Sequence, residues 1–163
     1  MTTTRTVQVT TPSDREVTIT RMFDAPRELV FKALTTPELI KQWLHGPNGW
    51  TMVTCEFDLR VGGGVRYEWK KSGGPKMGLT GTIRDFKAPE RIVHTERFDD
   101  DWTGGETQVT TTFTEHRGQT TLSITVRYAS VEARDAALRT GMTEGMNATY
   151  QMLDALLVTL QAA

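Results

Sequence analysis

Hydrophobic and polar residues alternate along most of this chain, and a period of two residues predicts β-strands. The first such segment places Val17, Ile19 and Phe23 on one face of a strand. The same period returns after Trp50 and continues through most of the remaining chain. The predicted strands cover residues 17–23, 53–59, 65–69, 79–86, 91–98, 109–113 and 122–128.

The segments that separate the last six predicted strands are short and rich in turn-forming residues, as in Gly62-Gly63-Gly64 and Ala88-Pro89. Such segments form turns and are too short to hold the helix that a parallel crossover requires. We therefore expect consecutive strands to pair as antiparallel neighbours.

Helical periodicity occurs between the first two strands and again at the end of the chain. Pro26 and Pro37 each suit the first turn of a short helix. Ser130 can cap a final helix, by far the longest. Its hydrophobic stripe consists of Leu138, Met142, Met146, Tyr150, Leu153, Leu157 and Leu160. The pattern predicts an α+β fold in which this helix packs across one face of the sheet.

Two glycines, Gly141 and Gly145, fall inside the predicted long helix, where each should cost about 1 kcal/mol relative to alanine. One interpretation is close packing of the helix backbone against a neighbouring element. The other is spare volume between helix and sheet, because Met142 and Met146 can adapt to irregular apolar shapes.

Length and charge narrow the class of protein. A chain of 163 residues fits one domain, predicted here over residues 15–163 after a loose N-terminal extension of residues 1–14. The net charge of -1 argues against nucleic acid and anionic membranes as partners. No segment has the roughly 20 apolar residues of a membrane span. Cys55 is the single cysteine, so no internal disulfide is available, and we expect a cytoplasmic protein.

Several motifs resemble a known family when they are taken in order. The run from Phe23 to Leu34 is similar to the opening signature of bacterial START-like (SRPBCC superfamily) proteins, in the branch of homologues of the heat-shock-protein-ninety ATPase activator. The other similar segments are Pro37-Glu38-Leu39 with Trp43, Asp58-Leu59-Arg60-Val61-Gly62-Gly63, Gly81-Thr82-Ile83, Pro89-Glu90-Arg91-Ile92-Val93, Arg134-Asp135-Ala136 and Gly141-Met142. The resemblance spans residues 15–160 and implies a helix-grip fold, with a curved antiparallel sheet wrapped around the C-terminal helix and a hydrophobic cavity between them.

The resemblance also implies that one face of the strand over residues 91–98, which carries His94 and Glu96, points toward that cavity. His94 stands where relatives often have an aromatic residue. The residues expected to contact a ligand are Tyr67, Trp69, Ile83, His94, Glu96, Met142, Met146 and Tyr150. His94 and Glu96 are the candidate catalytic pair, because a histidine beside a carboxylate can move protons. Alternatively, they only hydrogen-bond a ligand, or they face solvent.

Arg21 lies between Ile19 and Phe23 and would face inward by strict alternation. A buried guanidinium needs a carboxylate partner, for which Glu96 is a candidate. The alternative is an arginine at the strand edge whose head reaches water. The three histidines lie in separate elements without ligand spacing, so the sequence predicts no metal site and no cofactor.

Three functions are compatible with this pattern. The leading hypothesis is a carrier or sensor that encloses a small, largely hydrophobic molecule between the sheet and the C-terminal helix. The second is an enzyme of the aromatase or polyketide cyclase type that uses the same cavity. The third, which comes from the family resemblance, is an interaction module that stimulates a chaperone ATPase. Exposed apolar residues would also permit a homodimer.

Overall fold

The computed structural model describes residues 5–101 and 103–162, so residues 1–4 of the predicted N-terminal extension lie outside it. The helices are α1 (Arg27–Thr35), α2 (Pro37–Trp43), α3 (Val131–Leu138) and α4 (Met142–Ala162). The strands are β1 (Gln8–Thr10), β2 (Glu16–Phe23), β3 (Trp50–Phe57), β4 (Gly64–Lys71), β5 (Lys76–Lys87), β6 (Arg91–Phe98), β7 (Thr107–His116) and β8 (Gln119–Arg127). The predicted α+β class is confirmed.

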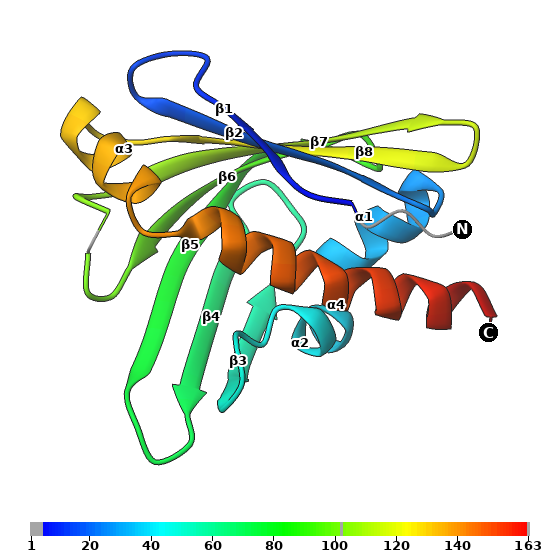
Figure 1. Ribbon diagram of the computed structural model, residues 1–163, viewed down its shortest axis with the longest axis horizontal. Helices are drawn as coiled ribbons and strands as arrows, with labels where there is room; N and C mark the ends of the chain where they lie inside the picture. Colours follow the sequence, from blue (N-terminus) through cyan, green and yellow to red (C-terminus); the bar gives the residue numbers. More distant parts are fainter. Residues whose placement is uncertain (1–4, 102, 163) are drawn as a thin grey trace.

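The strands form one eight-stranded antiparallel sheet in the order β1-β2-β8-β7-β6-β5-β4-β3. Every predicted turn between β3 and β8 joins antiparallel neighbours. The sheet bends strongly, so that β3, β4 and β5 turn away from β2, β7 and β8, while α4 crosses the concave side (Figure 1). Register shifts next to Met52 and Ile83 contribute to the bend, because β-bulges increase the local twist. The arrangement is the helix grip that the family resemblance implied.

The N-terminal segment is part of the sheet, through a strand that the hydrophobic pattern did not predict. In β1, Val9 pairs with Ile19 of β2. The backbone N–H of Val7 also donates a hydrogen bond of 2.8 Å to the side-chain oxygen of Asn147 on α4. Residues 7–10 are therefore tied to both the sheet edge and the long helix.

The prediction of one continuous C-terminal helix is wrong, because the segment forms two helices separated at Gly141. The positive φ of 74° at Gly141 is a conformation that favours glycine and that a helix does not contain. Gly145 alone lies within α4, and a Cβ added there would meet no atom within 4 Å. The predicted cap is confirmed, since the Ser130 hydroxyl oxygen accepts a hydrogen bond from the Ala133 N–H.

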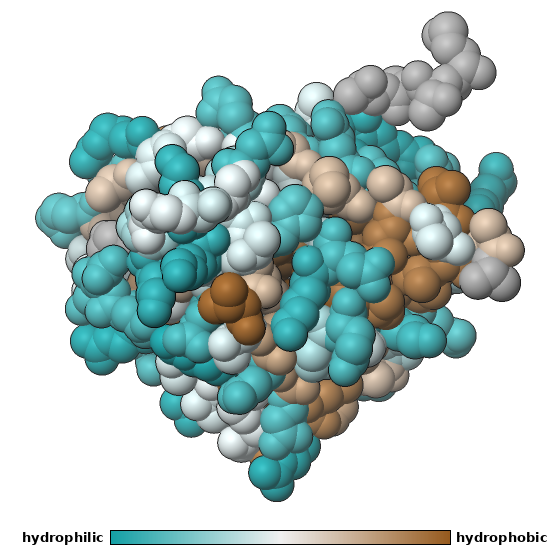
Figure 2. Space-filling view, turned by 90° about the horizontal axis from the view of Figure 1, so that it is seen from below, coloured by the Kyte–Doolittle hydropathy of each residue, from teal (hydrophilic) through white to brown (hydrophobic). Residues whose placement is uncertain are grey.

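Buried hydrophobic residues form two clusters. The main core packs β2, β7 and β8 against α1 and the C-terminal half of α4, with Phe23, Phe113 and Leu153 among its members. The second cluster lies under β3, β4, β5 and α2, and consists of Ile40, Met52, Val65, Tyr67, Trp69, Leu79 and Ile83. Outside, hydrophilic residues cover most of the face seen in Figure 2, and hydrophobic residues gather toward the C-terminal end of α4.

Arg21 is buried in the main core, with an exposed fraction of 3%. Its guanidinium donates to both carboxylate oxygens of Asp154 on α4, over 2.8 and 2.6 Å, and lies 4.6 Å from the ring centroid of Phe23. The expected partner Glu96 is thus wrong, and so is the alternative of a solvent-reaching arginine. The helix that crosses β2 supplies the carboxylate, a pairing across 133 positions that strand alternation could not reveal.

Candidate ligand-binding site

His94 occupies the middle of the concave face, between the two hydrophobic clusters. It pairs in register with Ile83 of β5 on one side and Val109 of β7 on the other. Only 8% of the residue is exposed. The alternation along β6 therefore directs His94 toward the interior, as the family resemblance implied, and it leaves a polar ring surrounded by apolar neighbours.

Glu96 holds the His94 ring in a defined orientation. The imidazole Nε2 lies 2.9 Å from the Glu96 Oε2. A carboxylate accepts hydrogen bonds, so the Nε2 carries the hydrogen and donates it to Glu96. In the neutral ring, the Nδ1 is then an acceptor, and this atom is buried without a hydrogen-bond partner in the described part of the chain. An apolar site thus contains one unused acceptor.

Two tyrosines lie close enough to Glu96 to sense its charge. Burial, followed by the charge of Glu96, raises the pKa of Tyr67 well above its usual value. The same two causes raise the pKa of Tyr128. Both hydroxyls therefore remain protonated at neutral pH, and the negative charge near His94 belongs to Glu96.

Gly81 allows β5 to approach β6 next to this pair. A Cβ at Gly81 would collide with the carbonyl oxygen of Thr95. Any larger residue would push the strands apart beside His94 and Glu96. The glycine of the Gly81-Thr82-Ile83 motif is therefore required by the geometry of the site.

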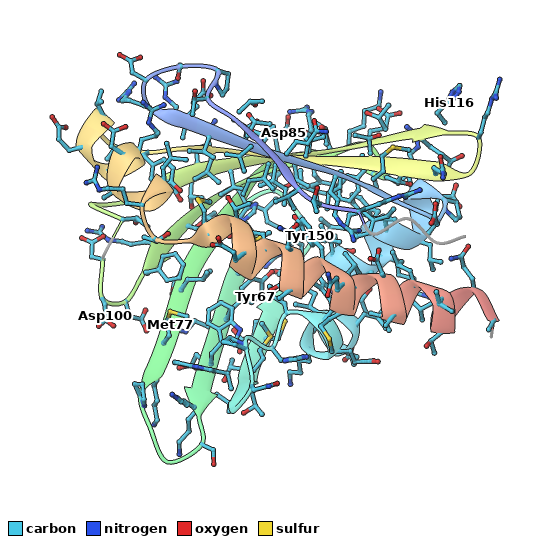
Figure 3. All side chains as sticks on the ribbon, in the orientation of Figure 1. Tyr67, Met77, Asp85, Asp100, His116 and Tyr150 are labelled. Carbon is cyan, nitrogen blue, oxygen red and sulfur yellow. The ribbon has the colours of Figure 1, made fainter. Side chains whose placement is uncertain are left out.

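The helix side of the site is formed by α4. Met142 and Met146 are half-buried and pack against the main core. Tyr150 is fully buried, with its ring edge-on to Phe23 at 5.2 Å, and its hydroxyl has no hydrogen-bond partner among the described residues. Burial raises the pKa of Tyr150. Figure 3 shows Tyr67 and Tyr150 near the place where α4 crosses the sheet.

The structure brings the predicted ligand-binding residues together in two groups. Tyr67, Trp69 and Ile83 belong to the second cluster, where the rings of Tyr67 and Trp69 meet edge-on at 5.8 Å. Met142, Met146 and Tyr150 belong to or pack against the main core. His94 and Glu96 lie between these groups. We name these eight residues the concave site.

A surface cleft of about 480 Å³ lies elsewhere, along β3, β4, β5 and the turn at Asp99 and Asp100. Of the residues in the concave site, only Trp69 lines it. Met77 and Asp100, labelled in Figure 3, mark this cleft at the outer margin of the sheet. The enclosed hydrophobic cavity expected from the family resemblance stays a prediction.

Comparison with known proteins decides the family. The family model described as "Activator of Hsp90 ATPase homolog 1-like protein" (AHSA1) matches residues 24–158. The chain belongs to the AHSA1 family. The family has the helix-grip fold of the SRPBCC superfamily, so the resemblance seen in the sequence motifs is confirmed. No curated protein matches this sequence.

Solved structures of similar proteins extend this result. A crystal structure from Rhodobacter sphaeroides is 36% identical, with a TM-score of 0.90 over 94% of this AHSA1 member and 99% of that chain. Ms6760 from Mycobacterium smegmatis is 28% identical, with a TM-score of 0.78 over 93% of this chain and 96% of that one. An AHSA1-like protein from Aeromonas hydrophila is 21% identical, with a TM-score of 0.67 over 85% of this chain and 93% of that one, and supports the fold alone.

Two residues of this AHSA1 member were missing from the predicted site. Tyr128 follows β8 and was assigned only to a strand pattern, although its alternation with Val126 already placed it on the inner face. Asp154 lies on α4 beside Leu153 and looks like a solvent-facing position. Only the crossing of α4 over β2 reveals its role, so no local signal could have found it.

Other chemistry in the described residues is limited. No group of three or more histidine, cysteine, aspartate and glutamate side chains is arranged there to hold a metal ion. Burial raises the pKa of the Cys55 thiol to about 11, so the thiol stays protonated at neutral pH and is a poor nucleophile. Among the helices in the same ranges, none is long and apolar enough to cross a membrane.

Proposed function

We propose that this AHSA1 family member binds a small, largely hydrophobic molecule between the sheet and the N-terminal half of α4, as a carrier or sensor. The observation that carries the proposal is the buried His94 ring, whose Nδ1 has no partner while Glu96 fixes the ring from the other side. Buried polar atoms are normally hydrogen-bonded, and an unused one marks a place where a ligand can supply the missing bond.

The surroundings of His94 favour an apolar ligand body. Tyr67 and Ile83 approach from the sheet, and both are buried. Met142 and Met146 on the facing helix are only half-buried, so their flexible side chains have surface left to bury. Gly145 between them adds no side chain, and a Cβ there would meet nothing within 4 Å. Apolar surface on both sides of one polar anchor is the composition of a small-molecule site.

Fluorescence with the neutral apolar probe N-phenyl-1-naphthylamine tests the proposal. The wild-type protein should enhance the probe's emission, and Met146→Lys should weaken binding by about tenfold or more, because the charge would enter the site. Met152→Lys is the matched control, since Met152 is an exposed methionine of the same helix. Circular dichroism verifies that both variants fold. An absence of enhancement, or equal effects of the two variants, would refute the proposal.

An aromatase or polyketide cyclase type of enzyme is a second candidate, favoured by the 2.9 Å bond between His94 and Glu96. A histidine oriented by a carboxylate can act as a general base. His94→Ala and Glu96→Ala should then abolish turnover of a candidate substrate while probe binding stays measurable. Unchanged turnover in both variants would remove these residues from any mechanism.

The description of the family supports a third candidate, stimulation of a chaperone ATPase. It predicts a change in ATPase rate when the protein is mixed with the chaperone, and an unchanged rate at saturating protein would end it. The remaining expectations belong to the same proposal: action in the cytoplasm, no nucleic-acid partner, and a homodimer that light scattering would detect.

A further inference from the structure

We infer from Glu96 and His94 that the ligand of the concave site carries no negative charge and ends in a hydrogen-bond donor, of which a hydroxyl group is the simplest. The inference rests on the proposed function and narrows the class of ligand. It separates alcohols and phenols from carboxylic acids with the same hydrophobic body, although both would satisfy the apolar surroundings equally well.

The first argument is the charge of the site. Glu96 is buried apart from 23% of its side chain, and its single ion-pair partner in the described residues is His94. Its charge reaches Tyr67 and Tyr128, both of which are neutral. An anionic ligand group placed among these residues would lose its hydration and meet a carboxylate of the same sign.

Positive groups that could offset Glu96 are already used. Arg21, the buried arginine of the concave side, gives two hydrogen bonds to Asp154. Arg66 is bound to both carboxylate oxygens of Asp99 and to Glu68, which alternates with Tyr67 and so lies on the opposite face of β4. A ligand carboxylate in the concave site would therefore find no free guanidinium among these two.

The second argument is the hydrogen-bonding polarity of His94. Since the Nε2–H donates to Glu96, the neutral ring presents the Nδ1 lone pair as an acceptor. That atom is buried and unpartnered in the ranges that the structure describes. Its complement is an O–H or N–H donor on the ligand, which an ionised carboxylate does not have.

NMR titration with octan-1-ol and with octanoate at neutral pH tests the inference, because the two probes share one hydrocarbon chain. Octan-1-ol should bind about tenfold or more tightly than octanoate, with shifts at the amides of β6 and the first half of α4. Glu96→Gln preserves the shape of the side chain and should raise the affinity for octanoate. Glu56→Gln, which removes an exposed carboxylate on β3, is the matched control and should leave both affinities unchanged.

The outcomes separate this inference from the proposed function. Equal affinities, or tighter binding of octanoate, would overturn the inference while N-phenyl-1-naphthylamine binding still supported the site. The inference would also fall if Glu96→Gln and Glu56→Gln changed the octanoate affinity equally. Failure of all three probes to bind would overturn the proposed function, and the inference with it.

Discussion

The two halves of α4 meet the same sheet in different ways. From Tyr150 onward the helix buries Leu153, Leu156 and Leu157 in the main core and lies beside α1 and α2 (Figure 1). From Met142 to Thr149 it has no buried side chain at all. One continuous helix therefore combines a packed half, which holds the fold together, with a loosely packed half, which faces His94 and Glu96. The difference shows that stability and ligand access can be assigned to separate turns of one element.

Truncation in each half gives the largest expected contrast. Leu153→Ala should reduce the free energy of unfolding by about 3 kcal/mol, because it opens a cavity in a closely packed core. Met146→Ala should cost about 1 kcal/mol or less, since the side chain is half-exposed. Urea denaturation measures both. Equal losses would mean that the N-terminal half is as tightly packed as the C-terminal half.

The ion pair of the packed half should have the next largest effect. Asp154→Asn keeps the shape but leaves the Arg21 guanidinium, 1% exposed, without its countercharge. We expect a loss of about 2 kcal/mol, less than for a fully buried pair because 43% of the Asp154 side chain is exposed. Asp85→Asn breaks a solvent-exposed pair with Arg91 and should cost about 0.5 kcal/mol or less. Thermal denaturation of the two variants would contradict this assignment if they melted together.

The break before the loosely packed half should matter less. Gly141→Ala forces a residue with a Cβ into a φ of 74°, at a cost of about 1 kcal/mol. The strain should fall on the junction of α3 and α4, so hydrogen exchange should increase for the first turn of α4 while β7 and β8 stay protected. No change in exchange would show that the junction adopts a different conformation in solution.

Gly145→Ala should have the smallest effect and the opposite sign. The site is helical and has open space, so alanine should stabilise the protein by roughly 0.5 kcal/mol. Urea denaturation measures the gain. A loss of stability would mean that a neighbouring group, absent from the described contacts, approaches the helix here.

The sequence predicted the elements whose signals are local. Alternation located β2 to β8, and glycine-rich separators predicted their antiparallel pairing; the inward direction of His94 came from the family resemblance. The same reasoning extended the last helix through Gly141, because the hydrophobic stripe continues across the break and only a backbone angle interrupts it. It also missed the short strand β1, whose three residues carry too little pattern.

Nonlocal contacts account for the remaining differences. Arg21 and Asp154 meet only because α4 crosses β2, and the division of the core into two clusters depends on the bend of the sheet. The bond between His94 and Glu96 was within reach of strand geometry, since residues two apart share a face. The unpartnered Nδ1 depends on every neighbour at once, and no pattern along one strand could predict it.

The place of β2 in the sheet affects how this protein can be shortened. The family match begins at residue 24, just after β2 ends at Phe23. Yet β2 pairs with β8 along its whole length and brings Arg21 to Asp154. A fragment cut at the boundary of the family match would leave β8 as an unpaired edge and a carboxylate without its cation, and such edges promote aggregation. The unit recognised by similarity is therefore shorter than the unit that can fold.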